Sequence, residues 1–95
     1  MRNYEAMYIL RADLEEEALE AAVARFDDVV KSNNGEIVKT ERWGKRRLAY
    51  EVNGKTEGYY ILMTFKAPNN VSNELDRILK IQDDVLRHLV IKKDA

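Results

Sequence analysis

The order in which two kinds of hydrophobic periodicity follow each other constrains the fold of this chain most. Runs rich in aromatic and aliphatic residues, as expected of β-strands, lie at residues 4–10, 36–52, 58–67 and 85–91. Apolar residues at helical spacing lie between the first and second runs, and again between the third and fourth. The sequence therefore predicts the order strand, helix, strand, strand, helix, strand, which is the split βαβ pattern.

This order predicts an α+β, ferredoxin-like fold, in which two helices cover one face of a four-stranded antiparallel sheet. In the first strand, Tyr4, Ala6, Tyr8 and Leu10 share one face, and we expect this face to be buried under the helices. The chain has 95 residues and no internal repeat or linker. Residues 1–95 are therefore expected to form a single domain, with a polar tail over residues 92–95.

Short polar segments mark the ends of the predicted elements. Asp13 is expected to cap the first helix, because an acidic residue stands three positions later. The Asn-Asn-Gly sequence at residues 33–35 should end this helix with a left-handed residue. Asn53-Gly54 predicts the turn of an antiparallel hairpin. Gly44 interrupts a long strand and predicts a bulge or bend there.

The residue types argue against catalysis and against a bound metal. His88 is the one histidine of the chain, and it has no ligand motif beside it, so we expect a surface or edge residue. An acylphosphatase-like enzyme would need glycine in the turn Arg11-Ala12-Asp13, which has none. The four glycines form no phosphate-binding loop. We therefore expect a protein that is not an enzyme and that has no catalytic residue, cofactor, metal or small-molecule substrate.

Two further features concern the compartment in which the chain works. It contains no cysteine, which fits a reducing cytoplasm and excludes disulfides. No run approaches the roughly 18 apolar residues of a membrane span, and the first residues contain no apolar signal region. A cytoplasmic protein without a membrane partner is expected.

Charge is unevenly distributed along the chain, although the formal net charge is only -1. Residues 13–28 contain seven acids and one base, a local net charge of -6. Residues 39–55 contain six bases and two acids, a local net charge of +4. Such a molecule can present one basic face to phosphates while it remains nearly neutral overall.

The segment 43–50 is basic and carries an aromatic residue at each end, Trp43 and Tyr50. One interpretation is RNA binding; the other, at least as well supported by the segment alone, is a solvated basic strand whose aromatics pack on the core. Neighbouring strand residues point to opposite faces, so Arg46 and Arg47 serve one flat site only if Gly44 bends the strand. Several apolar residues must also lie on the open face of the sheet, as ordinary surface or as a docking face for another protein.

At this point the residues resemble a known family over nearly the full chain. The motifs are Met-Arg-Asn-Tyr-Glu at residues 1–5, Gly-Lys-Arg-Arg-Leu-Ala-Tyr at 44–50, Gly-Tyr-Tyr at 58–60 and Ile-Gln-Asp-Asp-Val-Leu-Arg at 81–87. Their sequence, order and spacing are similar to the bacterial small-subunit ribosomal protein S-six family. The resemblance implies a ferredoxin-like fold in a structural constituent of the cytoplasmic ribosome. It also implies binding to the central domain of small-subunit ribosomal RNA as a heterodimer with small-subunit protein eighteen, in support of subunit assembly.

Site residues follow from the same motifs. Arg2 and Arg87 are expected to contact RNA, and Lys92 and Lys93 are added because of their charge and position. The expected partner-protein residues are Trp43, Arg46, Arg47, Leu48, Tyr50 and Tyr60. The sequence leaves open whether Arg2 lies close to the two terminal lysines. It also leaves an alternative function, a ferredoxin-like regulatory or ligand-binding domain. Because some family members have a longer C-terminal tail, we expect tail contacts with the partner to be reduced.

Overall fold

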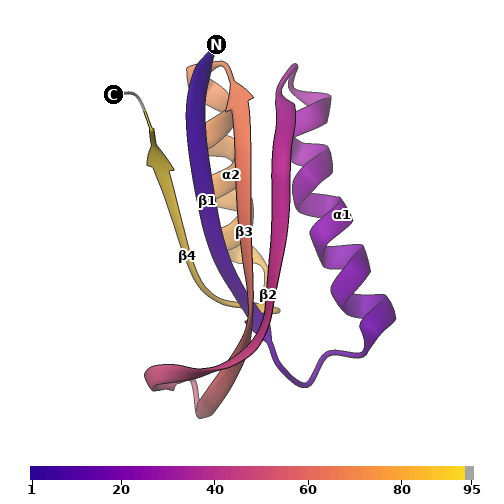
Figure 1. Cartoon of the computed structure of the whole chain (residues 1–95), viewed down its shortest axis with the longest axis vertical. Coiled ribbons are helices and arrows are strands. Elements are labelled where there is room, and N and C mark those ends of the chain that lie inside the picture. Colours follow the sequence, from indigo (N-terminus) through magenta and orange to yellow (C-terminus); the bar gives the residue numbers. More distant parts are fainter. Residues whose placement is uncertain (94–95) are drawn as a thin grey trace.

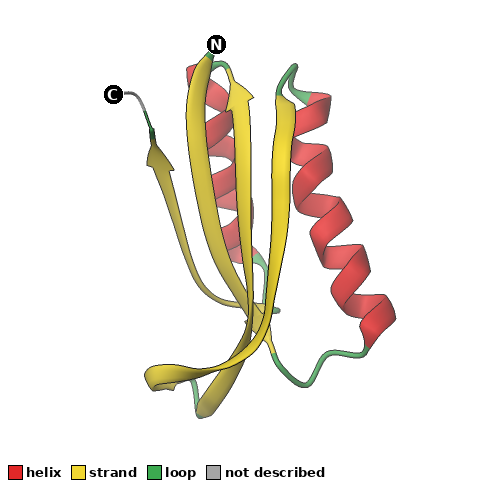
Figure 2. Ribbon diagram, in the orientation of Figure 1, coloured by secondary structure: helices red, strands yellow, loops and turns green. Residues whose placement is uncertain are grey.

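The structure is a computed structural model that describes residues 1–93, and it confirms the predicted fold class (Figure 1). The elements are β1 (Arg2–Arg11), α1 (Glu16–Ser32), β2 (Glu36–Val52), β3 (Lys55–Ala67), α2 (Asn69–Ile81) and β4 (Val85–Lys92). The strands form one sheet in the order β2-β3-β1-β4, and every neighbouring pair is antiparallel. Both helices lie on the same side of this sheet and leave its other face open (Figure 2).

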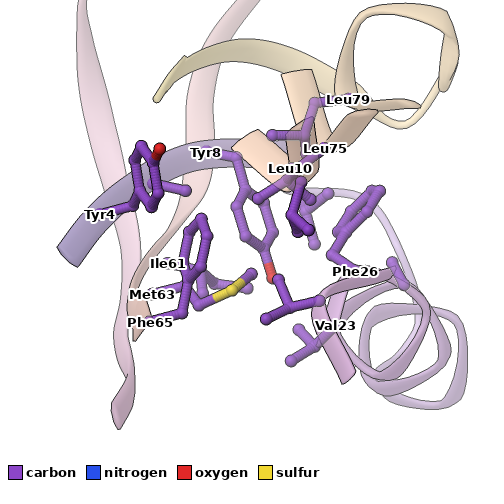
Figure 3. Packing of buried hydrophobic residues seen from close by; sticks show 14 of the residues in the cluster. Tyr4, Tyr8, Leu10, Val23, Phe26, Ile61, Met63, Phe65, Leu75 and Leu79 are labelled. Atoms are coloured by element: carbon purple, nitrogen blue, oxygen red, sulfur yellow. The ribbon is translucent and has the colours of Figure 1, made fainter. Parts of the chain in front are cut away.

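The core lies between the sheet and the helices (Figure 3). Tyr4, Ala6, Tyr8 and Leu10 are all buried, which confirms the face predicted for β1. Tyr8 meets Phe26 of α1 edge to face, with 4.9 Å between ring centroids. The other core members are Leu19, Ala22, Val23 and Val30 of α1, Ile61, Met63, Phe65 and Ala67 of β3, and Val71, Leu75 and Leu79 of α2. Burying a large apolar side chain stabilises the fold by about 1.5–3 kcal/mol. The helix-covered face of the sheet therefore serves mainly to stabilise the fold.

The turn signals are confirmed at three of four places. Asn34, at φ 68°, ends α1, and Asn53 and Gly54 form the hairpin turn with φ 50° and 78°. Gly44 has φ 84° and lies at a break in the register between β2 and β3. The predicted cap is wrong. The Asp13 side chain caps no helix, because its carboxylate binds Arg11 at 2.9 Å, and α1 begins only at Glu16.

The outer part of the β2–β3 hairpin, residues 45–58, is called the arm below; it bends across one end of the open face (Figure 1). The bend arises because four residues of β2, 48–51, stand opposite the single residue 56 of β3. Leu48 and Val52 of the arm are 8% and 9% exposed, so the arm is packed against the molecule. A Cβ atom on Gly58 would lie 2.2 Å from Ile9 Cγ2, so only glycine permits this approach without movement.

The structure ends within the predicted polar tail. Lys92 is the last residue of β4, and the Lys93 backbone N–H donates to the Asn3 carbonyl at 2.8 Å. The remaining tail residues, 94–95, lie outside the described residues. None of the helices in residues 1–93 has the length and apolar content that crossing a membrane requires.

Gly58→Ala tests whether the arm is held by this close approach. We expect the substitution to lower the free energy of unfolding by about 1–3 kcal/mol, because the new methyl group overlaps Ile9. In an Ile9→Ala background the same change should be neutral or stabilising, since alanine suits a strand better than glycine. Urea unfolding of the four proteins measures both effects. An equal loss of stability in both backgrounds would show that Ile9 is not the obstacle.

Candidate RNA and protein interfaces

Three of the four predicted RNA-contacting residues meet at one end of the sheet. Because β1 and β4 are antiparallel, Tyr4 pairs with Lys92, and Lys93 pairs with the beginning of β1 through its backbone. Arg2, Lys92 and Lys93 therefore lie close together, which settles the question that the sequence left open. Lys93 Nζ is 3.4 Å from a Glu5 carboxylate oxygen, so part of this charge is balanced locally. We call these three residues the end cluster.

Arg87, the fourth predicted RNA residue, lies apart from the end cluster. It stands opposite Ile9 on β4, five residues before Lys92, or about 17 Å along the strand. Its guanidinium carbon is 4.9 Å from the centroid of the Tyr50 ring, a distance typical of a cation–π contact. The structure thus joins a residue expected at the RNA to one expected at the protein partner, although they are 37 positions apart in sequence.

The aromatic residues of the basic segment do not belong to the core. Trp43 is 39% exposed and Tyr50 is 61% exposed, so the interpretation that both pack on the core is wrong. The Arg46 guanidinium carbon lies 5.4 Å from the Trp43 ring centroid. Leu48, by contrast, is buried within the chain and offers little surface to a partner. The segment therefore presents aromatic and arginine side chains at the surface, whereas Leu48 is buried.

The open face of the sheet carries a mostly apolar groove of about 280 Å³ between the arm and β4. The lining residues come from β1, the arm, β3 and β4: Met7, Ile9, Leu48, Ala49, Tyr50, Val52, Tyr60, Arg87, His88 and Leu89. Leu89 and Ile91 of β4 are 60% and 41% exposed, so apolar surface continues along this edge. The prediction that apolar residues lie on the open face is correct.

Several other arginines and lysines lie beside acids. Arg42 binds Glu20 of α1, and Lys39 Nζ lies 3.6 Å from Glu41. On α2, the Arg77 guanidinium is 2.5 Å from Glu74 and holds the pKa of that carboxyl below its usual value. Of the six bases in residues 39–55, Lys39, Arg42 and Lys55 therefore lie beside acids.

His88 lies on the edge strand β4, as predicted, but it is paired with an acid and is not freely exposed. Its side chain is 18% exposed, and Nε2 lies 3.0 Å from an Asp76 carboxylate oxygen of α2. The pair links β4 to the helix layer. Within residues 1–93, no three or more histidine, cysteine, aspartate or glutamate side chains are placed to hold a metal ion.

Sequence reasoning missed two features of these surfaces. Leu89 and Ile91 belong to the apolar edge, but the run Leu-Arg-His-Leu-Val-Ile at residues 86–91 lacks the alternation that would have revealed it. The pairing of Arg87 with Tyr50 left no local signal, because it depends on the bend of the arm.

Comparison with known proteins agrees with this architecture. The sequence matches the family model of Ribosomal protein S6 over residues 3–92. The small ribosomal subunit protein bS6 of Desulforamulus reducens is 50% identical over 93 residues, which cover 98% of each chain. The protein of the same name from Carboxydothermus hydrogenoformans is 49% identical over 94 residues, covering 99% of this chain and 98% of that relative.

A solved structure extends the likeness to three dimensions. The crystal structure of 30S ribosomal protein S6 from Thermotoga maritima matches with a TM-score of 0.91 at 29% sequence identity. The match covers 97% of this chain and 87% of that chain. The sequence match extends over almost every residue, and the strands and helices superpose. The chain therefore belongs to the ribosomal protein S6 family, whose members are structural, non-enzymatic components of the small subunit of the cytoplasmic ribosome.

Proposed function

We propose that this chain binds the central domain of small-subunit ribosomal RNA as a heterodimer with small-subunit protein eighteen and so supports assembly of the subunit. The RNA is contacted by the end cluster (Arg2, Lys92 and Lys93) and by Arg87. The partner protein covers the apolar groove of the open face. Two separated positive contacts suit a protein that fixes the relative position of two RNA segments.

The proposed RNA binding rests mainly on the observation that the three basic residues of the end cluster lie close together. Arginine and lysine bind phosphates through charge and several N–H donors, and these contacts position a protein on RNA without reading its sequence. The acidic first turn of α1, with Glu16 and Glu17, lies in the helix layer, away from the open face. Repulsion between these acids and phosphates therefore turns α1 away from RNA.

The proposed binding of the partner protein rests on the apolar groove of the open face. It is bounded by Tyr60, by the arm and by Leu89, a large side chain that is mostly exposed in the free chain. Covering such apolar surface is favourable by roughly 25 cal/mol per Å². Because the chain carries a net charge of only -1, we expect its own RNA affinity to be modest and the heterodimer to bind more tightly.

Arg87→Ala tests the RNA contact at β4. Loss of a charged hydrogen bond to phosphate should weaken binding of a central-domain ribosomal RNA fragment roughly tenfold. The slope of log K against log salt should fall by about 0.9. Filter binding at several salt concentrations, with and without protein eighteen, measures both quantities.

The matched control is Arg77→Ala, which removes the same charge from the helix layer, where Arg77 is bound to Glu74. Its RNA affinity should equal that of the unmodified chain. Equal affinities for the Arg87 and Arg77 variants would remove Arg87 from the interface. No RNA binding by the folded chain, alone or with the partner, would favour a regulatory domain of the same fold.

Leu89→Glu tests the partner surface. A charge placed in the apolar groove should weaken association with protein eighteen at least tenfold, because the carboxylate must lose its hydration. Ile81→Glu is the control, since Ile81 is also 60% exposed but ends α2 in the helix layer. Titration calorimetry of both variants measures the effect. A similar loss in both, or in neither, would place the partner elsewhere.

A further inference from the structure

The arginines of the described chain differ in what holds their guanidinium groups. Arg11, Arg42 and Arg77 lie beside the carboxylates of Asp13, Glu20 and Glu74. Arg46 and Arg87 lie over the rings of Trp43 and Tyr50 instead. Within residues 1–93, no carboxylate lies within salt-bridge distance of either of these two arginines.

The two kinds of contact leave different parts of the guanidinium group available to a ligand. A carboxylate occupies the N–H donors in the guanidinium plane and neutralises the charge. An aromatic ring contacts the face of the guanidinium, so the five donors at its edge still point outward. An arginine held by a ring therefore keeps its charge and its bidentate donors, while fewer side-chain conformations remain to be lost when an anion binds.

Tyr50 is placed over Arg87 by the packing of the arm. Leu48 and Val52, on either side of Tyr50 in the chain, are buried, and Gly58 permits the close approach to Ile9. Although the Tyr50 side chain is 61% exposed, its backbone is thus tied to the sheet. Arg87 belongs to the edge strand β4, next to Ile9. Ring and guanidinium therefore come from two independently fixed elements.

We propose that Tyr50 is a positioning residue for RNA binding: its ring holds Arg87 so that the guanidinium edge faces an RNA phosphate. This inference rests on the assignment of Arg87 to RNA in the proposed function. It gives Tyr50 a role at the RNA and not only at the protein partner. An anion suits this place, because Arg87 lacks a carboxylate partner within residues 1–93. Arg46 and Arg47 of the arm lack one as well, so the anion can be an extended one such as RNA.

The test compares Tyr50→Leu with Tyr50→Phe, each in the unmodified and the Arg87→Ala backgrounds. Filter binding to the central-domain RNA fragment should show affinity about two- to fivefold lower for Tyr50→Leu, the range for an exposed cation–π contact. Tyr50→Phe, which keeps a ring, should bind like the unmodified chain. In the Arg87→Ala background, Tyr50→Leu should have no further effect, because the arginine that it positions is gone.

Three results would overturn the proposal. The first is unchanged or tighter RNA binding by Tyr50→Leu, tighter binding meaning that the ring competes with RNA for Arg87. The second is the same loss in the Arg87→Ala background. The third is weaker binding of protein eighteen with RNA affinity intact, which would confine Tyr50 to the partner surface.

The NMR signal of Arg87 Nε–H in the free chain tests the contact without RNA. Tyr50→Leu should remove the upfield ring-current shift of this signal, and Tyr50→Phe should keep it. If the unmodified chain binds no RNA, the proposed function fails, even where the shift is present. If it binds RNA but Tyr50→Leu does not change the affinity, only the positioning role fails. Circular dichroism and thermal unfolding confirm that each variant is folded.

Discussion

The close contact between Gly58 and Ile9 is the constraint on which the open face depends. Because Gly58 has no side chain, the arm lies against the sheet and buries Leu48 and Val52. The arm then forms one wall of the apolar groove and places Tyr50 over Arg87. A larger residue at position 58 would disturb the groove and the cation–π contact together, although neither lies in the main core.

The two faces of the sheet have different roles. The helices fill one face of the sheet with core residues and carry acids in the first turn of α1. The other face keeps the groove, which Arg87 lines, while the end cluster lies where β1 begins and β4 ends. Internal ion pairs such as Arg42 with Glu20 neutralise bases that would otherwise join these surfaces. Net charge therefore says little about RNA binding, whereas the positions of the individual cations on the surface say much.

Local sequence signals were sufficient for the order of elements, the buried face of β1 and the turns at Asn34 and Asn53-Gly54. They failed where a distant residue decides the outcome. Asp13 carries a capping signal, but Arg11 and Lys55 bind its carboxylate. His88 lies on the edge strand as expected, but its contact with Asp76 forms only after β4 packs beside α2. The end cluster required the antiparallel pairing of β1 with β4, and the Arg87–Tyr50 contact required the bend of the arm. The RNA and partner contacts of individual residues stay predictions.

The proposed function requires that the strands, and not the helices, carry the contacts with RNA and with the partner protein. NMR chemical-shift mapping of the isotopically labelled chain, titrated with the central-domain RNA fragment and then with protein eighteen, tests it most directly. We expect RNA to shift the amide signals of the end cluster and Arg87, and the partner to shift those of Met7, Tyr60 and Leu89. Signals of α1 should stay unchanged. Shifts concentrated in α1 and α2, with the sheet residues unaffected, would show that the helices form the interface instead.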